Sequence, residues 1–303
     1  MSDLTEIITK DGSFTLRSSF FNENFHSLQG ALAETKIKFI NPSDLKRFQN
    51  KSIKVLDICF GLGYNSAYLF SELFKQNSTL DWYALEIDKK PLAYALENKY
   101  FHELWDPKIL RIFNSLYQNN SFEDKFFKCN IFWGEARKKI NNIPTETKFD
   151  LIFLDSFSPQ KCPQLWSVEF LSKISEKLNP QGYLITYTSS AAVRKTLRSI
   201  GLEIFSIRQN LNSRNSWSQG TVAISKFDKK NLINNPHFKK LSLLEEEHLL
   251  TKASIPYRDP FLRDTKEDIM KKRLKEQLLS NLNSTNNWRD KWGMTKSTLK
   301  SKI

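Results

Sequence analysis

Cysteine is scarce in this chain of 303 residues, and the few cysteines that exist lie far apart. They are Cys59, Cys129 and Cys162, and the four histidines are equally scattered along the chain. This distribution lacks the close spacing of zinc ligands and offers no disulfide framework. We therefore expect neither a metal site nor disulfide bonds.

Long apolar runs are missing as well. The first ten residues contain no apolar segment of signal-peptide length, and nowhere do about 18 apolar residues follow one another, as a membrane-spanning helix requires. We expect a soluble protein of a reducing compartment, the cytoplasm, with no membrane partner.

Acidic residues are fewer than basic ones. The chain has 33 acidic and 46 basic residues, and its net charge is +13. That excess is high for an enzyme of small molecules and ordinary for a protein that binds nucleic acid. Charge alone does not separate nucleic-acid binding from a merely basic surface.

Glycine is also sparse, with nine in all, but two of them stand together in the segment that organises the chain, residues 54–65. An apolar, β-branched run containing Asp57 leads into Gly61 and Gly63, and a segment with helical apolar spacing follows. A strand, a tight turn and a helix in this order let a ligand approach the backbone and direct free N–H groups at it. The pattern is Gly-x-Gly-x-Asn, ending at Asn65, and lacks the third glycine of the dinucleotide fingerprint. An adenosine without phosphates is therefore a better ligand than a pyrophosphate.

Six further apolar runs follow, and helical patterns separate the first five of the seven strands. The expected strands are residues 55–60, 80–88, 129–135, 149–155, 183–188, 202–207 and 221–225. The fourth is the most apolar and should be central. The last two strands have room only for a hairpin-like return, which predicts an antiparallel seventh strand. The fold class is α/β, with a seven-stranded mixed sheet.

Three of these strands end in acidic residues. In open α/β sheets ligands bind at the carboxyl ends of the strands, so these side chains should surround the ligand. Glu86 is placed to accept hydrogen bonds from ribose hydroxyls, Glu135 from an adenine amino group, and Asp155 lies beside the reacting atom. The loop after Asp155 is stiffened by two prolines, Pro159 and Pro163.

The domain organisation follows from these patterns. Residues 46–226 form the nucleotide-type domain, residues 1–45 an N-terminal extension and candidate lid, and residues 227–303 a basic, mainly helical extension. Residues 226–303 hold 18 Lys and Arg against 10 Asp and Glu, a net of +8. Contact with nucleic acid and a solvated appendage both remain open for this tail.

Several stretches between residues 11 and 225 resemble a family of methyltransferases that use S-adenosylmethionine (SAM). The chain is similar to the MnmC-like tRNA 5-methylaminomethyl-2-thiouridine methyltransferases, and the Asp-x-Phe-x-Pro-x-x-x-Pro-x-x-Trp run is the most distinctive match. The matching stretches are Phe25-His26-Ser27, Gly30-Ala31, Glu34, Phe60-Gly61-x-Gly63-x-Asn65, Glu86, Gly134-Glu135, Leu154-Asp155-x-Phe157-x-Pro159, Lys161-x-Pro163-x-x-Trp166, Thr186-Tyr187-Thr188-Ser189, Val193-Arg194 and Gln219-Gly220-Thr221-Val222.

The resemblance implies a Rossmann-like class I SAM-dependent methyltransferase fold and a set of site residues. SAM would be bound by Asp57, Gly61, Gly63, Asn65, Glu86 and Glu135. Asp155 would be catalytic, no metal would be needed, and the substrate pocket would include His26, Phe157, Pro159 and Trp166. His26 taken alone is more typical of a structural histidine.

The implied reaction is tRNA modification. SAM would methylate the nitrogen of the 5-aminomethyl group on the wobble uridine, within the anticodon stem-loop of tRNA, giving 5-methylaminomethyluridine. The chain carries no second nucleotide fingerprint and lacks the roughly 350 residues that a flavin oxidase module needs. We therefore expect methyl transfer alone, with a separate enzyme supplying the aminomethyl tRNA.

Two other functions stay open at this point. A spermidine-synthase-like aminopropyl transferase shares the fold and the acidic loop, although a chain of net charge +13 is a poor host for a polycation. A non-catalytic RNA-binding module would be favoured by loss of Asp155 or of the glycine turn, and both are present.

Overall fold

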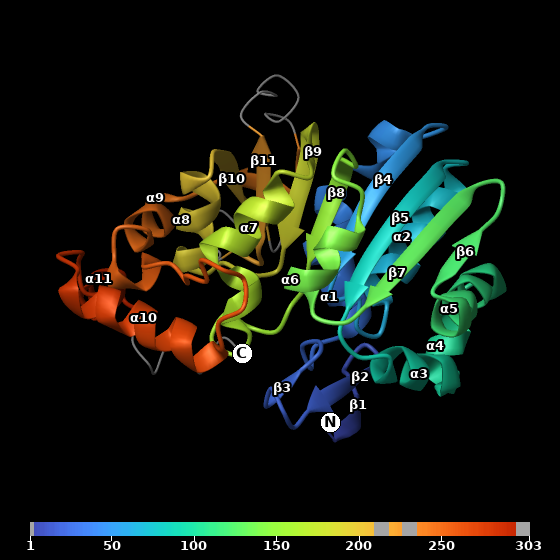
Figure 1. Cartoon of the computed structure of the whole chain (residues 1–303), viewed down its shortest axis with the longest axis horizontal. Coiled ribbons are helices and arrows are strands. Elements are labelled where there is room, and N and C mark those ends of the chain that lie inside the picture. The colour runs from blue at the N-terminus through green and yellow to red at the C-terminus, as the bar shows by residue number, and fades with distance from the viewer. Residues whose placement is uncertain (1–2, 209–217, 226–234, 295–303) are drawn as a thin grey trace.

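The centre of the molecule is one large mixed β-sheet (Figure 1). The computed structural model describes residues 3–208, 218–225 and 235–294. The strands of this sheet are β4 (Ser52–Ile58), β5 (Thr79–Glu86), β6 (Ser121–Glu123), β7 (Phe127–Trp133), β8 (Phe149–Leu154), β9 (Leu178–Thr186), β10 (Leu202–Ile207), β11 (Thr221–Ser225) and β12 (Phe238–Lys240). Their order across the sheet is β12-β10-β11-β9-β8-β4-β5-β7-β6.

The order and direction of the strands confirm the expected α/β fold. Strands β9, β8, β4, β5 and β7 pair in parallel, and β8 lies in the middle, as its apolar sequence predicts. Strand β11 is antiparallel to both β9 and β10, which confirms the antiparallel seventh strand. The sheet has nine strands rather than seven because β6 and β12, of three residues each, extend its two edges.

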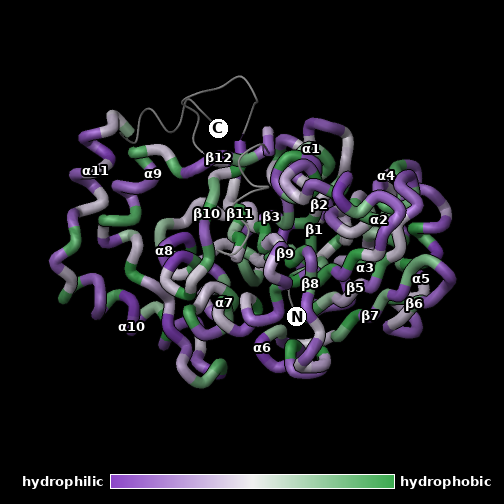
Figure 2. Tube along the Cα trace, turned by 90° about the horizontal axis from the view of Figure 1, so that it is seen from above, coloured by the Kyte–Doolittle hydropathy of each residue, from purple (hydrophilic) through white to green (hydrophobic). Residues whose placement is uncertain are grey.

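Helices cover both faces of the sheet, and alternate residues of each central strand supply the two cores. In β4, Val55 faces one core and Leu56 the other. Seen from above, α1 and α2 lie on one side of the strands and α6 and α7 on the other (Figure 2). The helices up to this point of the chain are α1 (Ala31–Thr35), α2 (Tyr64–Lys75), α3 (Lys90–Glu97), α4 (Lys99–Leu104), α5 (Pro107–Asn119), α6 (Ala136–Lys139), α7 (Val168–Ser175) and α8 (Ala191–Ser199).

The N-terminal extension begins with a separate three-stranded antiparallel sheet. Its strands are β1 (Leu4–Ile8), β2 (Phe14–Ser18) and β3 (Glu23–Asn24), in the order β1-β2-β3. It lies below the carboxyl ends of the central strands (Figure 1). None of these three strands is among the seven expected from the sequence, and β3 is only two residues long.

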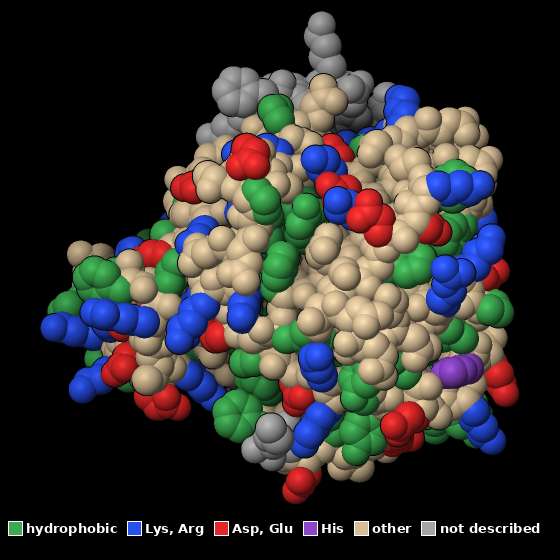
Figure 3. Space-filling view, turned by 45° about the vertical axis from the view of Figure 1, so that its right-hand side comes forward, with side chains coloured by type: hydrophobic (Ala, Val, Ile, Leu, Met, Phe, Trp, Pro, Cys, Tyr) green, Lys and Arg blue, Asp and Glu red, His purple; other side chains and the backbone are tan. Residues whose placement is uncertain are grey.

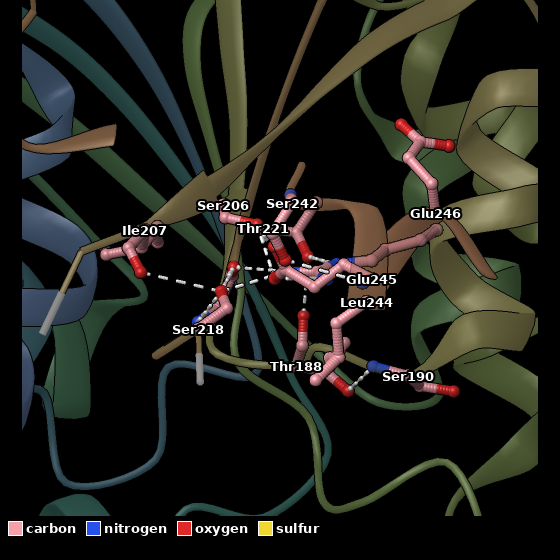
Figure 4. Close-up of polar contacts among 12 residues, drawn as sticks. Thr188, Ser190, Ser206, Ile207, Ser218, Thr221, Ser242, Leu244, Glu245 and Glu246 are labelled. Atoms are coloured by element: carbon pink, nitrogen blue, oxygen red, sulfur yellow. Dashed lines mark hydrogen bonds and ion pairs between the residues drawn. The ribbon is translucent and has the colours of Figure 1, made fainter. Parts of the chain in front are cut away.

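The C-terminal extension is built from α9 (Leu243–His248), α10 (Lys266–Leu279) and α11 (Thr285–Lys291). A buried ion pair between Arg194 of α8 and Glu245 of α9 joins it to the sheet (Figure 4). The Arg194 guanidinium also donates to Thr221 and Ser218, and the Glu245 carboxylate accepts from Ser206. A charge this deeply buried needs such a complete set of partners. In the described part of the chain no helix has both the length and the apolar character to cross a membrane.

Candidate active site

A cavity of about 690 Å³ opens at the carboxyl edge of the central strands. Its walls are the loops that follow β4, β5, β7 and β8 on one side and residues 18–27 of the N-terminal extension on the other. A volume of this size lies within the usual range of small-molecule sites. The position is the one that the acidic strand ends predict.

The glycine turn after β4 forms part of the cavity wall, and its two glycines have different tasks. Gly61 has φ +58° and lines the cavity, where an added β-carbon would lie 3.3 Å from the Phe25 ring. Gly63 has φ +87° and lies behind the wall, where an added β-carbon would come within 2.5 Å of the Phe113 ring. Gly63 therefore allows close packing at the start of α2, whereas Gly61 leaves room beside the cavity.

Glu86, the last residue of β5, holds the glycine turn in place. One carboxylate oxygen accepts the N–H of Gly61 at 2.8 Å, and the other accepts the N–H groups of Ile87 and Asp88 at 2.6 and 3.0 Å. Burial raises the pKa of Glu86, while these three donors lower it. Its carboxylate lines the cavity with acceptor capacity left for hydroxyl donors.

Glu135 presents an unsatisfied acceptor. One of its carboxylate oxygens accepts from the backbone N–H and the Nε of Arg137, both at 3.1 Å. The other, Oε2, is buried and has no hydrogen-bond partner among the described residues. Because a buried acceptor without a donor is unfavourable, this oxygen fits a ligand that brings an N–H, such as an adenine amino group.

Asp155 follows β8, is half-buried and lines the cavity. Asn65 Nδ2 donates to its Oδ2 at 2.7 Å, and Thr35 Oγ1 fixes the Asn65 amide through its oxygen at 2.9 Å. Burial, followed by the Glu34 carboxylate, raises the pKa of Asp155 to about 8. The carboxyl group therefore binds a proton readily in the ligand-free protein and favours a cation placed beside it.

Two predicted substrate-pocket residues line the cavity, His26 and Phe157. His26 shares a 3.0 Å hydrogen bond between its Nδ1 and the Thr15 hydroxyl, and burial lowers its pKa to about 4, so it is neutral near pH 7. His26 therefore makes a structural hydrogen bond and also lines the cavity. The Phe157 ring lies two residues beyond Asp155.

The other predicted site residues are not among those that line the cavity. They are Asp57, Gly63, Asn65, Pro159 and Trp166. Asp57 is fully buried under the turn and accepts from Ser66 Oγ at 2.6 Å. Trp166 is buried too, and its Nε1 donates to the Phe157 carbonyl at 2.9 Å. Asn65 donates a hydrogen bond to Asp155, and Pro159 is buried.

The N-terminal extension brings residues that the sequence did not single out as site residues. Glu23 accepts from both the N–H and the Oγ of Ser158, at 2.9 and 2.5 Å, across 135 positions of the chain. Glu34 lines the cavity and forms an ion pair with Lys38. Only the family match to Glu34 gave any signal of these contacts, because side chains so distant in sequence show no periodicity together.

The cavity is strongly acidic. Six carboxylate side chains and no Lys or Arg are found among its described lining residues; the six are Glu23, Glu34, Glu86, Asp88, Glu135 and Asp155. Such a lining attracts cations and repels phosphates. No group of three or more potential metal ligands occurs within residues 3–208, 218–225 and 235–294.

Comparison with known proteins agrees with this geometry. A family model described as S-adenosyl-L-methionine-dependent methyltransferase matches residues 99–220. The crystal structure of MnmC2 from Aquifex aeolicus is similar at 30% identity and a TM-score of 0.77, covering 92% of this chain and 87% of that one. The chain belongs to the MnmC-like methyltransferase family. It is therefore a SAM-dependent methyltransferase, as the resemblance implied.

Two curated relatives set the extent of the match. An uncharacterized protein of Methanocaldococcus jannaschii is 29% identical over 282 residues, which is 89% of this chain and 73% of that protein. The tRNA 5-methylaminomethyl-2-thiouridine biosynthesis bifunctional protein MnmC of Campylobacter hominis is 28% identical over 192 residues, 60% of this chain. The match covers only 28% of that bifunctional protein, so the MnmC-like likeness concerns its methyltransferase part.

Proposed function

We propose that this protein transfers the methyl group of SAM to the 5-aminomethyl nitrogen of the wobble uridine in tRNA, giving 5-methylaminomethyluridine. The observation that carries the proposal is the position of Asp155. Its carboxyl group lines a cavity whose other acidic side chains suit a nucleoside. The names of the bifunctional relatives support the tRNA substrate.

The cofactor-binding role falls to the residues at the ends of β4, β5 and β7. Glu86 would accept the ribose hydroxyls, Gly61 leaves the backbone open to the ligand, and the free Glu135 Oε2 would accept the adenine amino group. When bound, SAM supplies a methyl group on a sulfonium, which is a good leaving group. The acidic lining attracts this cation.

Asp155 would stabilise the product of the attack. A neutral amine that attacks a methyl group becomes positively charged, and a carboxylate within contact distance favours that charge only as it develops. Asn65 would hold the Asp155 carboxylate in position, because its Nδ2 donates to Asp155 Oδ2 at 2.7 Å. Because both Asp155 and the substrate amine must lose a proton first, activity should rise toward alkaline pH.

The RNA must bring its target base to this cavity. An anticodon base reaches an enclosed site by leaving its stack, and Phe157 offers an apolar wall where it would enter. The phosphates must stay outside, since no cation is found among the described lining residues. The reaction would take place in the cytoplasm, on tRNA whose aminomethyl group a separate enzyme has produced.

One observation also favours a second candidate, an aminopropyl transferase. Six carboxylates around a cavity suit a polyamine as well as a sulfonium. The net charge of the whole chain, +13, argues against this candidate, because a polycation is repelled before it reaches the cavity.

The deciding experiment measures transfer of labelled methyl from SAM to tRNA that carries 5-aminomethyluridine at the wobble position. Labelled product is expected with this tRNA and not with the same tRNA bearing plain uridine, and Asp155→Asn should lower the rate about a hundredfold or more. Asp150→Asn is the matched control, because Asp150 lies at the other end of β8 and accepts from Lys54 and Asn179. Absence of transfer by the wild type, or aminopropyl transfer to putrescine, would contradict the proposal.

A further inference from the structure

The loop between β2 and β3 is fixed over the mouth of the cavity. Glu23, at its end, accepts two hydrogen bonds from Ser158, which lies three residues past Asp155. At its start, the Ser18 hydroxyl accepts from the Phe21 N–H at 3.3 Å, and Ser19 donates to the Asp3 carbonyl at 3.2 Å. The loop is therefore held at both ends and presents a defined surface.

A row of aromatic rings runs along this loop into the cavity. Phe20 meets Phe21 edge to face with centroids 4.9 Å apart, and Phe21 stacks on Phe157 at 4.2 Å with an interplanar angle of 20°. The hydrogen bond from Trp166 to the Phe157 carbonyl holds the inner end of this row. The row thus connects the mouth of the cavity with the Asp155 loop.

Phe20, the outer member of the row, is exposed. Its side chain is 77% accessible to solvent, and it lines the same cavity as Asp155. A ring in this position contributes little to the core. A flat apolar ring at the mouth of a nucleotide site is suited to stacking on a base, an interaction that tolerates any base because each has a π face.

Phe20 is flanked in the hairpin by one basic and one acidic residue, Arg17 and Glu23, each three positions away. Arg17 of β2 is exposed, and its guanidinium donates to the side-chain oxygens of Asn22 and Asn24, which are neutral. No salt bridge of Arg17 is found within the described part of the chain, so its positive charge stays available to a phosphate. The hairpin therefore carries an exposed aromatic ring and an arginine whose hydrogen-bond partners among the described residues are neutral, next to a cavity lined by acidic side chains.

We propose that Phe20 stacks on an unpaired nucleobase of the substrate RNA at the mouth of the cavity, while Arg17 binds the phosphate backbone beside it. The inference rests on the proposed function and assigns the N-terminal hairpin to RNA recognition. In the proposed function the cofactor would be bound by Glu86 and Glu135 and not by Phe20.

The test compares Phe20→Ala, Phe20→Leu and Phe20→Trp with the wild type on an anticodon stem-loop RNA carrying 5-aminomethyluridine. Phe20→Ala should raise the KM for RNA by about 5- to 150-fold, the loss expected for one base–aromatic stack. Phe20→Leu should show a similar loss, Phe20→Trp should stay within about threefold of the wild type, and SAM affinity by calorimetry should not change. Arg17→Gln should lower the log–log salt slope by about 0.7 to 0.9.

Phe126→Ala is the matched control. Phe126 is also an exposed phenylalanine with a nearby cation, Lys125, but it precedes β7 and so lies at the opposite edge of the sheet. It should behave as the wild type. An unchanged KM in Phe20→Ala would overturn the inference, as would weaker SAM binding, or a change of oligomeric state in sedimentation, which would make Phe20 a protein contact.

Direct RNA binding separates this inference from the proposed function. Fluorescence anisotropy with the labelled stem-loop needs no methyl transfer. If the wild type binds the RNA tightly but transfers no methyl group, and Phe20→Ala binds weakly, the stacking role stands and the reaction fails. Equal binding by the two proteins overturns the stacking role alone.

Discussion

The surroundings of Asp155 disfavour the negatively charged form of its carboxyl group in the ligand-free protein. Its carboxyl group is enclosed by the loop after β8, and Glu34 lies near enough to disfavour a second negative charge. Both effects raise its pKa to about 8, while the Asn65 amide lowers it. A cation bound in the cavity would favour the charged form and lower the pKa of Asp155. The raised pKa agrees with the role proposed for Asp155, which is to stabilise a positive charge that develops beside it.

The raised pKa of Asp155 predicts how stability depends on pH. The pKa of Asp155 is about 8 in the folded protein and about 4 in the unfolded chain, so between these values the folded state holds a proton that the unfolded state has lost. Stability should therefore fall as pH rises from about 5 to 8. Asp155→Asn should lose this dependence and become more stable than the wild type as pH rises, by at most about 1.4 kcal/mol per pH unit.

Urea unfolding of the ligand-free protein at pH 5, 6, 7 and 8 measures the effect. Asp57, whose pKa burial raises to about 7, contributes in the same direction to both proteins. Because its charge also raises the pKa of Asp155, the difference between the two proteins includes the interaction of the two carboxyl groups. Asp150→Asn should follow the wild type at every pH. A constant difference between Asp155→Asn and the wild type would show that the carboxyl group titrates normally.

Site residues divide by how they could be found. Glu86, Glu135 and Asp155 line the cavity and were predictable, because a strand end is visible in sequence and parallel strands end at one edge. Phe20 and Glu23 were not, since their contacts with Phe21, Phe157 and Ser158 depend on the docking of one hairpin. Asp57 differs from these three acids: it lies within β4, is fully buried and does not line the cavity.

At the level of elements, long buried strands were predictable and short ones were not. Strands β5 and β8 begin and end within two residues of the expected positions, because their apolar runs are continuous. Strands β3, β6 and β12 have two or three residues, too few for a pattern, and exist only where a neighbouring strand offers its hydrogen-bonding edge. Helix α9 is similar, with six residues fixed by a capping box of Ser242 and Glu245.

The junction of α8, β11 and α9 predicts a large loss of stability on mutation. Arg194 and Glu245 are 1% and 3% exposed. Arg194 also donates to Thr221, Ser206, Ser218 and the Gly220 carbonyl, and Glu245 also accepts from Ser206 and Ser242. Removing one charge leaves the other buried without an ion-pair partner. Glu245→Ala should lower the free energy of unfolding by about 3 to 5 kcal/mol.

The neighbouring Glu246 provides a matched control. It pairs with Arg198 at 2.7 Å, but both side chains are more than 40% exposed. Glu246→Ala should therefore cost about 1 kcal/mol or less. Urea denaturation of the two variants decides the matter. Similar losses in both would mean that the buried network does not hold α9 to the core.

For the whole molecule, the net charge of +13 is not gathered into one patch on the face seen in Figure 3, where basic and acidic side chains are interspersed. The described lining of the cavity is acidic, so the excess of basic residues lies outside it. Long-range attraction of RNA then depends on several separate cations around the molecule. Residues 226–303, with their net of +8, are the largest contributor in sequence.

Only some of the basic side chains of α10 are available for binding RNA. Lys272 forms a salt bridge with Asp264, and Arg273 donates to the carbonyls of Ile255 and Ala253. These two have structural tasks, so replacing them would disturb the fold as well as the charge. Lys271 and Lys275 are exposed, one turn apart, and remain candidates for binding phosphate.

Replacing Lys271 and Lys275 with Gln should weaken RNA binding and lower the log–log salt slope by about 0.7 to 0.9 for each phosphate that is no longer neutralised. The fold should be unaffected, because neither side chain is buried. The matched control is Lys51→Gln with Lys125→Gln, two exposed lysines that precede β4 and β7 and so lie at the edge opposite the cavity. Anisotropy titrations of stem-loop RNA at several salt concentrations measure both quantities. If the α10 pair and the control pair give the same slope as the wild type, the extension serves the fold, and RNA binding falls to Arg17 and the hairpin.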